Sequence, residues 1–76
     1  MISEFIFYLN NWGCSNIIHR MHGPNLYPSN VGEVIIMNYM ARPTHFTVTE
    51  RIVDYDNHTI HYKVELCVEV GGLLGV

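Results

Sequence analysis

The chain has 76 residues, of which 49% are hydrophobic and 14% are charged, and its formal net charge is −3. No apolar run reaches the 18 or so residues that a membrane-spanning helix needs, and four basic residues are too few for a broad phosphate-binding surface. We therefore expect one small domain over residues 1–76, with another protein as its partner, no membrane association, and nucleic acid disfavoured as a ligand.

The first segment, residues 3–23, is predicted to be mainly helical. Its apolar side chains recur at the i, i+3, i+4 and i+7 spacing of one helix face: Phe5, Tyr8, Leu9 and Trp12. Ser3 can cap such a helix, and Gly13 suits the left-handed position that ends its first part. The alternative is a strand over residues 2–9, because phenylalanine, isoleucine and tyrosine all favour strands.

Three strands are predicted in the second half of the chain, at Val34–Met40, Phe46–Asp54 and Thr59–Val70. In the last of them, apolar residues alternate with polar or small ones: Ile60, Tyr62, Val64, Leu66, Val68 and Val70. A period of two places one set of side chains on a dry face and the other on a wet face, which is typical of an antiparallel sheet. Pro43 is expected to separate the first two strands, because proline cannot donate to a ladder.

The connection between the last two strands is predicted at residues 56–58, whose types tolerate turn backbone. Both apolar faces fall on even numbers, so antiparallel pairing requires a loop of three or five residues. A three-residue loop predicts two opposed pairs, Ile52 with Tyr62 and Val48 with Leu66. Glu50 then faces the core, unless a bulge turns it outward or it lies at an open rim.

These elements together predict an α+β fold, in which an N-terminal helical segment packs on a small antiparallel β-meander of three strands. The alternative is a small SH3-like, partly open barrel, if residues 2–9 supply another strand. The uncharged residues 71–76 are expected to form a flexible apolar tail or, alternatively, an apolar peg that inserts into a partner.

Five histidines are the compositional feature with most chemical content. On a helix, His19 and His22 share a face and follow Cys14, so these three residues are the candidates for a metal site. The spacing matches no known zinc pattern, and solvated or hydrogen-bonded histidines are the simpler interpretation. We expect no cofactor and no catalytic centre, because no nucleophile motif is present.

The low charge on so small a body predicts a subunit interface, and we expect a homodimer. By analogy of size and composition, the function we expect is that of a non-catalytic interaction module, such as a phage or mobile-element inhibitor that occludes a host protein complex. The candidate partner-binding residues are Glu50, Asp54, Tyr55, Asp56, Asn57, His58, Leu73 and Leu74. A sheet face that binds nucleic acid is the alternative function, and a metal-stabilised domain is a further one. Two cysteines and the absence of a signal-peptide pattern predict a cytoplasmic location.

Overall fold

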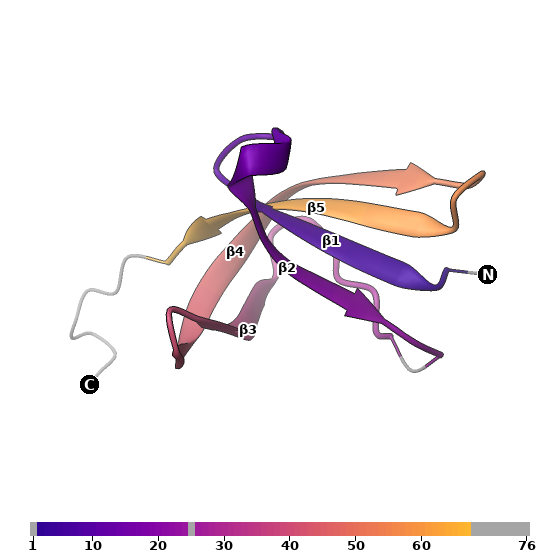
Figure 1. The fold of residues 1–76 in the computed structure, drawn as a ribbon. Helices are drawn as coiled ribbons and strands as arrows, with labels where there is room; N and C mark the ends of the chain where they lie inside the picture. Colours follow the sequence, from indigo (N-terminus) through magenta and orange to yellow (C-terminus); the bar gives the residue numbers. More distant parts are fainter. Residues whose placement is uncertain (1, 25, 68–76) are drawn as a thin grey trace.

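The computed structural model describes residues 2–24 and 26–67, and these form one curved sheet that makes a mixed half-barrel (Figure 1). The strands lie in the order β2-β1-β5-β4-β3. The elements are β1 (Glu4–Leu9), the 3-10 turn η1 (Cys14–Asn16), β2 (Ile17–His22), β3 (Val34–Tyr39), β4 (Arg42–Asp54) and β5 (Thr59–Leu66). None of the described segments is a helix long and apolar enough to cross a membrane.

The predicted N-terminal helix is wrong, because residues 4–9 and 17–22 are the strands β1 and β2. β1 lies inside the sheet, between β2 and β5, and its three central residues, Phe5–Phe7, are buried on both faces. Phe5 and Phe7 point into the concave core and are 3% and 4% exposed, while Ile6 lies on the opposite face and is only 7% exposed. In a strand that is apolar on both faces, apolar and polar residues no longer alternate along the sequence. Here the apolar residues of this segment happened to match the spacing of one helix face.

The three strands of the predicted meander are present, but they belong to a larger mixed sheet. β3 pairs with β4 and β4 with β5, both antiparallel. The strand on which the barrel alternative depended is also present, as β1. β1 pairs in parallel with β5, however, so the architecture is a mixed half-barrel, which is neither the expected α+β meander nor the alternative, a small SH3-like, partly open barrel.

The β3–β4 connection is tighter than predicted. Met40 and Ala41 form its two central positions with φ of 53° and 67°, which is the backbone of a hairpin turn matched to the strand twist. β4 therefore begins at Arg42, and Pro43 lies within it, opposite Asn38. Proline is tolerated there because alternate residues of an antiparallel strand direct their amide positions away from the neighbour. The expectation that Pro43 separates the strands is wrong.

The β4–β5 register also differs from the prediction. Asp54 lies opposite Thr59, so the turn comprises the four residues 55–58, and a bulge lies between Val48 and Glu50. The observed pairs are Val48 with Val64 and Ile52 with His61, and the two predicted pairs are wrong. Because of the bulge, the residues of β4 that follow it exchange faces, and Glu50 points outward. A bulge was one of the two expected ways to keep the Glu50 carboxylate out of the core. The bulge also leaves Ile52 on the outer face, 50% exposed.

The core fills the concave side of the half-barrel. Its fully buried side chains are Phe46, Val48, Tyr62 and Val64. The alternation predicted in the last strand is confirmed for Ile60, Tyr62 and Val64, which are all buried, whereas Leu66 is 46% exposed. The Tyr62 ring stacks on Phe7 at a centroid distance of 5.1 Å. Residues 68–76, with the predicted tail at 71–76, lie outside the described residues.

Candidate protein-binding surface

The outer face of the sheet carries a group of side chains that contact one another across three strands. We call it the Trp12 surface, and its members are Tyr8, Trp12, Glu50, Ile52, His61 and Lys63. Tyr8 and Leu9 lie beside Lys63 and Val64 in the parallel β1–β5 pairing, and Glu50 lies opposite Lys63 in the antiparallel β4–β5 pairing. The surface therefore depends on one hairpin pairing, β4 with β5, and on one pairing between segments far apart in the sequence, β1 with β5.

Trp12 reaches this surface because the chain turns sharply at the end of β1. Asn10 adopts a φ of 66°, a conformation that asparagine tolerates better than most residues, and its amide donates to the Val64 carbonyl at 2.8 Å. The Trp12 ring then folds back edge-on against Tyr8, with ring centroids 5.1 Å apart. Trp12 is only partly buried, so one part of the indole stays accessible to a partner.

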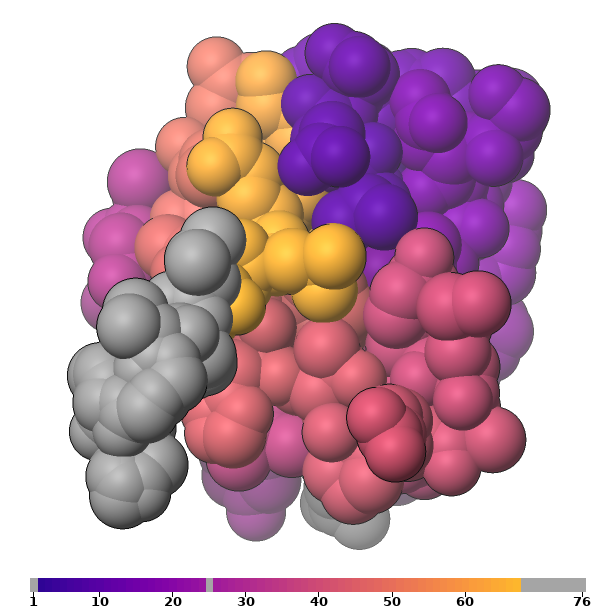
Figure 2. All heavy atoms as spheres, turned by 90° about the vertical axis from the view of Figure 1, so that its left-hand side faces the viewer, coloured from indigo at the N-terminus to yellow at the C-terminus, as the bar shows by residue number. Residues whose placement is uncertain are grey.

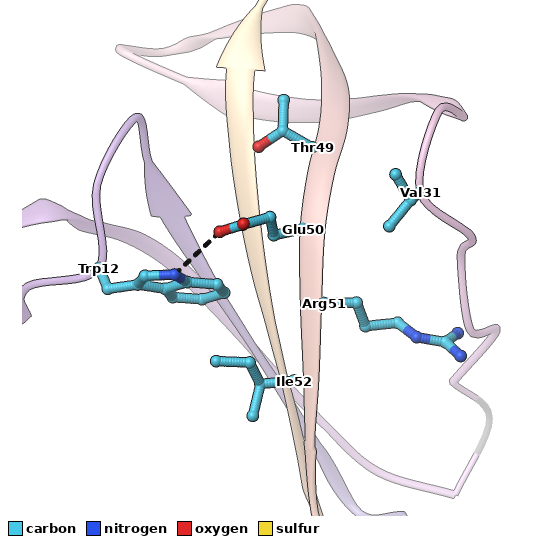
Figure 3. Close-up of a pocket in the computed structure, with 6 residues that line it drawn as sticks. All are labelled: Trp12, Val31, Thr49, Glu50, Arg51 and Ile52. Carbon is cyan, nitrogen blue, oxygen red and sulfur yellow. Dashed lines mark hydrogen bonds between the residues drawn. The ribbon is translucent and has the colours of Figure 1, made fainter.

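One carboxylate orients both Trp12 and Lys63. The indole Nε1 of Trp12 donates to Glu50 Oε1 at 3.1 Å, and Lys63 Nζ lies 2.8 Å from the same oxygen (Figure 3). The Lys63 ammonium also lies 5.7 Å from the centre of the Trp12 ring, within cation–π range. The hydrogen bond from Lys63, its positive charge and the hydrogen bond from Trp12 together lower the pKa of Glu50 below its ordinary value.

Tyr8 and His61 form a second polar pair beside Trp12. The Tyr8 hydroxyl and His61 Nδ1 are joined by a hydrogen bond of 2.8 Å, and their rings lie 5.6 Å apart. Burial is the main cause that raises the pKa of Tyr8, so this phenol stays protonated in the neutral range. This hydrogen bond holds both rings in place as part of the Trp12 surface.

Two hollows flank Trp12. The first, of about 420 Å³, is lined by Trp12, Val31, Thr49, Glu50, Arg51 and Ile52. Figure 3 shows Trp12 and Ile52 on one side of β4 and Arg51 and Val31 on the other, so this hollow spans the strand. The second, of about 370 Å³, is lined by Tyr8, Trp12, Gly13, Cys14, Ile52 and His61. Trp12 and Ile52 line both, so they form the apolar ridge between the hollows.

The sequence-predicted binding residues are divided between this surface and the β4–β5 turn. Asp54 caps that turn: its carboxylate accepts hydrogen bonds from the Asn57 amide at 3.2 Å and from Asn57 Nδ2 at 2.8 Å, and these lower its pKa. His58 has a φ of 54°, and its carbonyl accepts from the Ser3 amide at 2.8 Å. Tyr55 is 80% exposed, and Asp56 is also exposed.

Of the predicted carboxylates, only Glu50 belongs to the Trp12 surface, where Lys63 balances its charge. Glu50, Asp54 and Asp56 therefore do not make one uniformly acidic edge. Leu73 and Leu74 lie outside the described residues.

The candidate metal ligands do not converge. His19 and His22 would share a face on a helix, but on strand β2 residues three apart point to opposite faces. His19 lies against the Phe7 ring on the concave side, and His22 Nε2 lies 3.0 Å from Glu4 on the outer side. Cys14 is exposed beside Trp12. Within residues 2–24 and 26–67, no group of three or more His, Cys, Asp or Glu side chains is placed to hold a metal ion.

Five members of the Trp12 surface were missed by the sequence-based prediction. Tyr8 and Trp12 were assigned to the buried stripe of a helix, and Ile52 was assigned to the core. The polar positions of the alternating segment, His61 and Lys63, were correctly placed on a wet face but were not connected with Trp12. Only the parallel β1–β5 pairing brings them together.

Comparisons of this chain with protein-family models, with curated proteins and with solved structures found no match.

Proposed function

We propose that this chain is a small non-catalytic protein-binding module, which binds a partner protein through the Trp12 surface and acts by covering part of that partner. The observation that carries the proposal is the position of Trp12, held by Glu50 and Tyr8 between two hollows. Tryptophan and tyrosine dominate the binding energy of protein interfaces because they bury a large area with little loss of side-chain freedom.

The polar groups of the surface support this proposal. Glu50 pairs with Lys63 and Tyr8 with His61, so the side chains hold one another in position before a partner arrives. A preorganised surface loses less conformational entropy on binding. Such mutual pairing suits a contact surface better than a catalytic centre, where a nucleophile and a base must be directed at a substrate.

The side chains of the Trp12 surface indicate what kind of partner fits it. The ridge of Trp12 and Ile52 suits apolar side chains, which would enter the flanking hollows, and the Glu50–Lys63 pair suits a neutral polar rim around them. Asp54, Tyr55 and Asp56 extend this rim along β4 and into its turn. We propose a partner with a mainly apolar patch of matching size, rather than a strongly basic groove.

The test is affinity capture from the native host lysate, followed by direct titration of the captured protein. Trp12→Ala is expected to weaken binding at least roughly thirtyfold, the loss of about 2 kcal/mol that marks an interface hot spot. Tyr27→Ala is the matched control, because Tyr27 is an aromatic residue that is 84% exposed and lies outside the Trp12 surface. It is expected to bind as the unaltered chain does.

Circular dichroism must show that Trp12→Ala keeps its strands. A folded Trp12→Ala chain that binds the captured protein with unchanged affinity would contradict the proposal. Asp56→Lys measures the contribution of the exposed turn, and a weakening smaller than that of Trp12→Ala is expected, because rim charges contribute little to affinity.

A further inference from the structure

β3 lies at one end of the strand order, with β4 as its sole neighbour among the described residues. Tyr39 and Arg42 flank the two-residue hairpin turn, so they exchange hydrogen bonds, and the odd-numbered residues of β3 face β4 thereafter. The Val48 amide donates to the Glu33 carbonyl at 2.9 Å, which confirms this alternation at the other end of the strand. The amides and carbonyls of Val34, Ile36 and Asn38 therefore point to the open edge.

This edge lacks the features that usually protect an edge strand. Natural proteins block open edges with charges, prolines or bulges. The sequence of β3, VIIMNY, contains no charge, proline or glycine, and its pairing with β4 has no break in register. Val34 and Ile36 are 57% and 61% exposed. The other edge strand, β2, carries Arg20 and two histidines, so the two edges differ in character.

We propose that β3 pairs antiparallel with β3 of a second copy of this chain, about a two-fold axis that passes beside Ile36. In this register, Ile36 lies opposite Ile36 of the partner subunit and Val34 lies opposite Asn38 of the partner subunit. Every open amide and carbonyl of the three edge residues then has a partner. The surface is self-complementary, as a two-fold interface requires.

The side chains fit this arrangement on both faces of the joined sheet. On the outer face, two isoleucines meet at the axis and no like charges are opposed. On the concave face, Ile35 lies opposite Met37 of the partner subunit, and the reciprocal pair is identical. The edge of β3 already borders a mainly apolar hollow of about 170 Å³, which Ile35, Ile36 and Met37 line together with Phe5, Phe7, Met21, Tyr27 and Ser29, and a second β3 would extend this layer.

The hairpin that carries this strand is accessible. In Figure 2 its residues, coloured pink to red, lie at the lower front of the molecule, and Val34, Ile36 and Met40 are each more than half exposed. Because the strand is uncharged, it offers no electrostatic selection for a different protein. In the proposed register, each side chain of residues 34–38 lies opposite an uncharged side chain of the same strand in the second copy. A second copy of this chain is therefore the partner that fits this edge.

Sedimentation of the full chain tests the proposal first. A dimer is expected, and Ile36→Lys is expected to raise its dissociation constant by roughly tenfold or more, because two ammonium groups then oppose each other at the axis. Ile52→Lys is the matched control, since Ile52 is an isoleucine on a strand with a similar exposed fraction, 50% against 61%. It is expected to leave the dimer intact.

Cysteine cross-linking tests the register. In a background of Cys14→Ser and Cys67→Ser, the Ile36→Cys chain is expected to form a disulfide with its own copy, since hydrogen-bonded antiparallel residues have Cα atoms about 5.5 Å apart. Val34→Cys alone is expected not to cross-link, because four residues of offset separate the two sulfurs by roughly 13 Å. A mixture of Val34→Cys and Asn38→Cys chains is expected to cross-link.

A chain that sediments as a monomer at its highest usable concentration would overturn the proposal. So would a dimer that persists in Ile36→Lys and gives no Ile36→Cys cross-link, which would mean that another surface, or residues 68–76, forms the contact. These outcomes are independent of the Trp12 surface, because Ile52→Lys is expected to disturb partner binding and to spare the dimer.

Discussion

Trp12 is the single tryptophan of the chain, and its environment depends on the carboxylate of Glu50. Hydrogen bonds from Lys63 and Trp12 favour the charged form, so the pKa of Glu50 is lower in the folded chain than in the unfolded chain. The contribution of these bonds to the free energy of unfolding is therefore complete above the ordinary glutamate pKa of about 4.3. It is lost as the pH falls through the lower pKa that Glu50 has in the folded chain.

This dependence can be measured by tryptophan fluorescence, because the signal reports Trp12 alone. The emission is expected to stay constant down to about pH 4.3 and to change at lower pH, when Glu50 becomes protonated. Glu50→Gln is expected to remove this transition. Asp54→Asn is expected to retain it, although Asp54 also has a lowered pKa, because that carboxylate contacts Asn57. A transition with its midpoint at or above the ordinary pKa of glutamate would contradict the assignment.

At the scale of elements, one buried phenol joins the long connection between β2 and β3 to the core. Tyr62 is fully buried, and its hydroxyl accepts a hydrogen bond of 2.8 Å from the Ser29 amide. Arg51 donates to the Ser29 carbonyl at 3.0 Å from the neighbouring strand. The connection is thus held against the concave face by both backbone groups of one residue.

Tyr62→Phe is expected to keep the ring stack on Phe7 and to lose the bond to Ser29. The free energy of unfolding is expected to fall by about 1 kcal/mol, the typical net value of one hydrogen bond. Urea unfolding measures the change, and amide exchange at Ser29 should become faster. Tyr55→Phe is the control, because Tyr55 is 80% exposed. Equal unfolding midpoints for the two variants would show that the Ser29 bond does not stabilise the fold.

The elements differ in how far the sequence could predict them. The sequence predicts a strand over Thr59–Val70 from its alternation, and within the described residues β5 covers Thr59–Leu66, with one face buried and His61 and Lys63 on the other. β1 gave no such pattern, because Phe5 and Ile6 are both buried on opposite faces. The half-buried strand has a local signature, whereas the interior strand can be distinguished from a helix only by its neighbours.

At the scale of the whole molecule, the four basic side chains are dispersed. Lys63 pairs with Glu50 on the outer face, and Arg20 lies 3.4 Å from Glu4 near the β2 edge. Arg51 points to the other side of β4, toward the connection that contains Ser29 (Figure 3). Arg42 lies at the β3–β4 turn. A nucleic-acid surface instead needs cations gathered along one face.

This distribution predicts that the chain does not bind nucleic acid at physiological salt. Fluorescence anisotropy with a labelled single-stranded oligonucleotide is expected to show no saturable change. Binding that weakens steeply with added salt and is reduced in Arg51→Ala or Lys63→Ala would support the nucleic-acid alternative and contradict this prediction.

The sequence by itself determined the three C-terminal strands and the wet face that carries His61 and Lys63, because alternation along one segment records which side of it is buried. It also indicated that Glu50 needs either a bulge or a rim. The tertiary structure alone decided that β1 pairs in parallel with β5, that the bulge lies beside Thr49, and that Trp12 meets Glu50 and Lys63. These features depend on contacts between residues distant in the chain, and such contacts leave no periodic pattern in either segment alone.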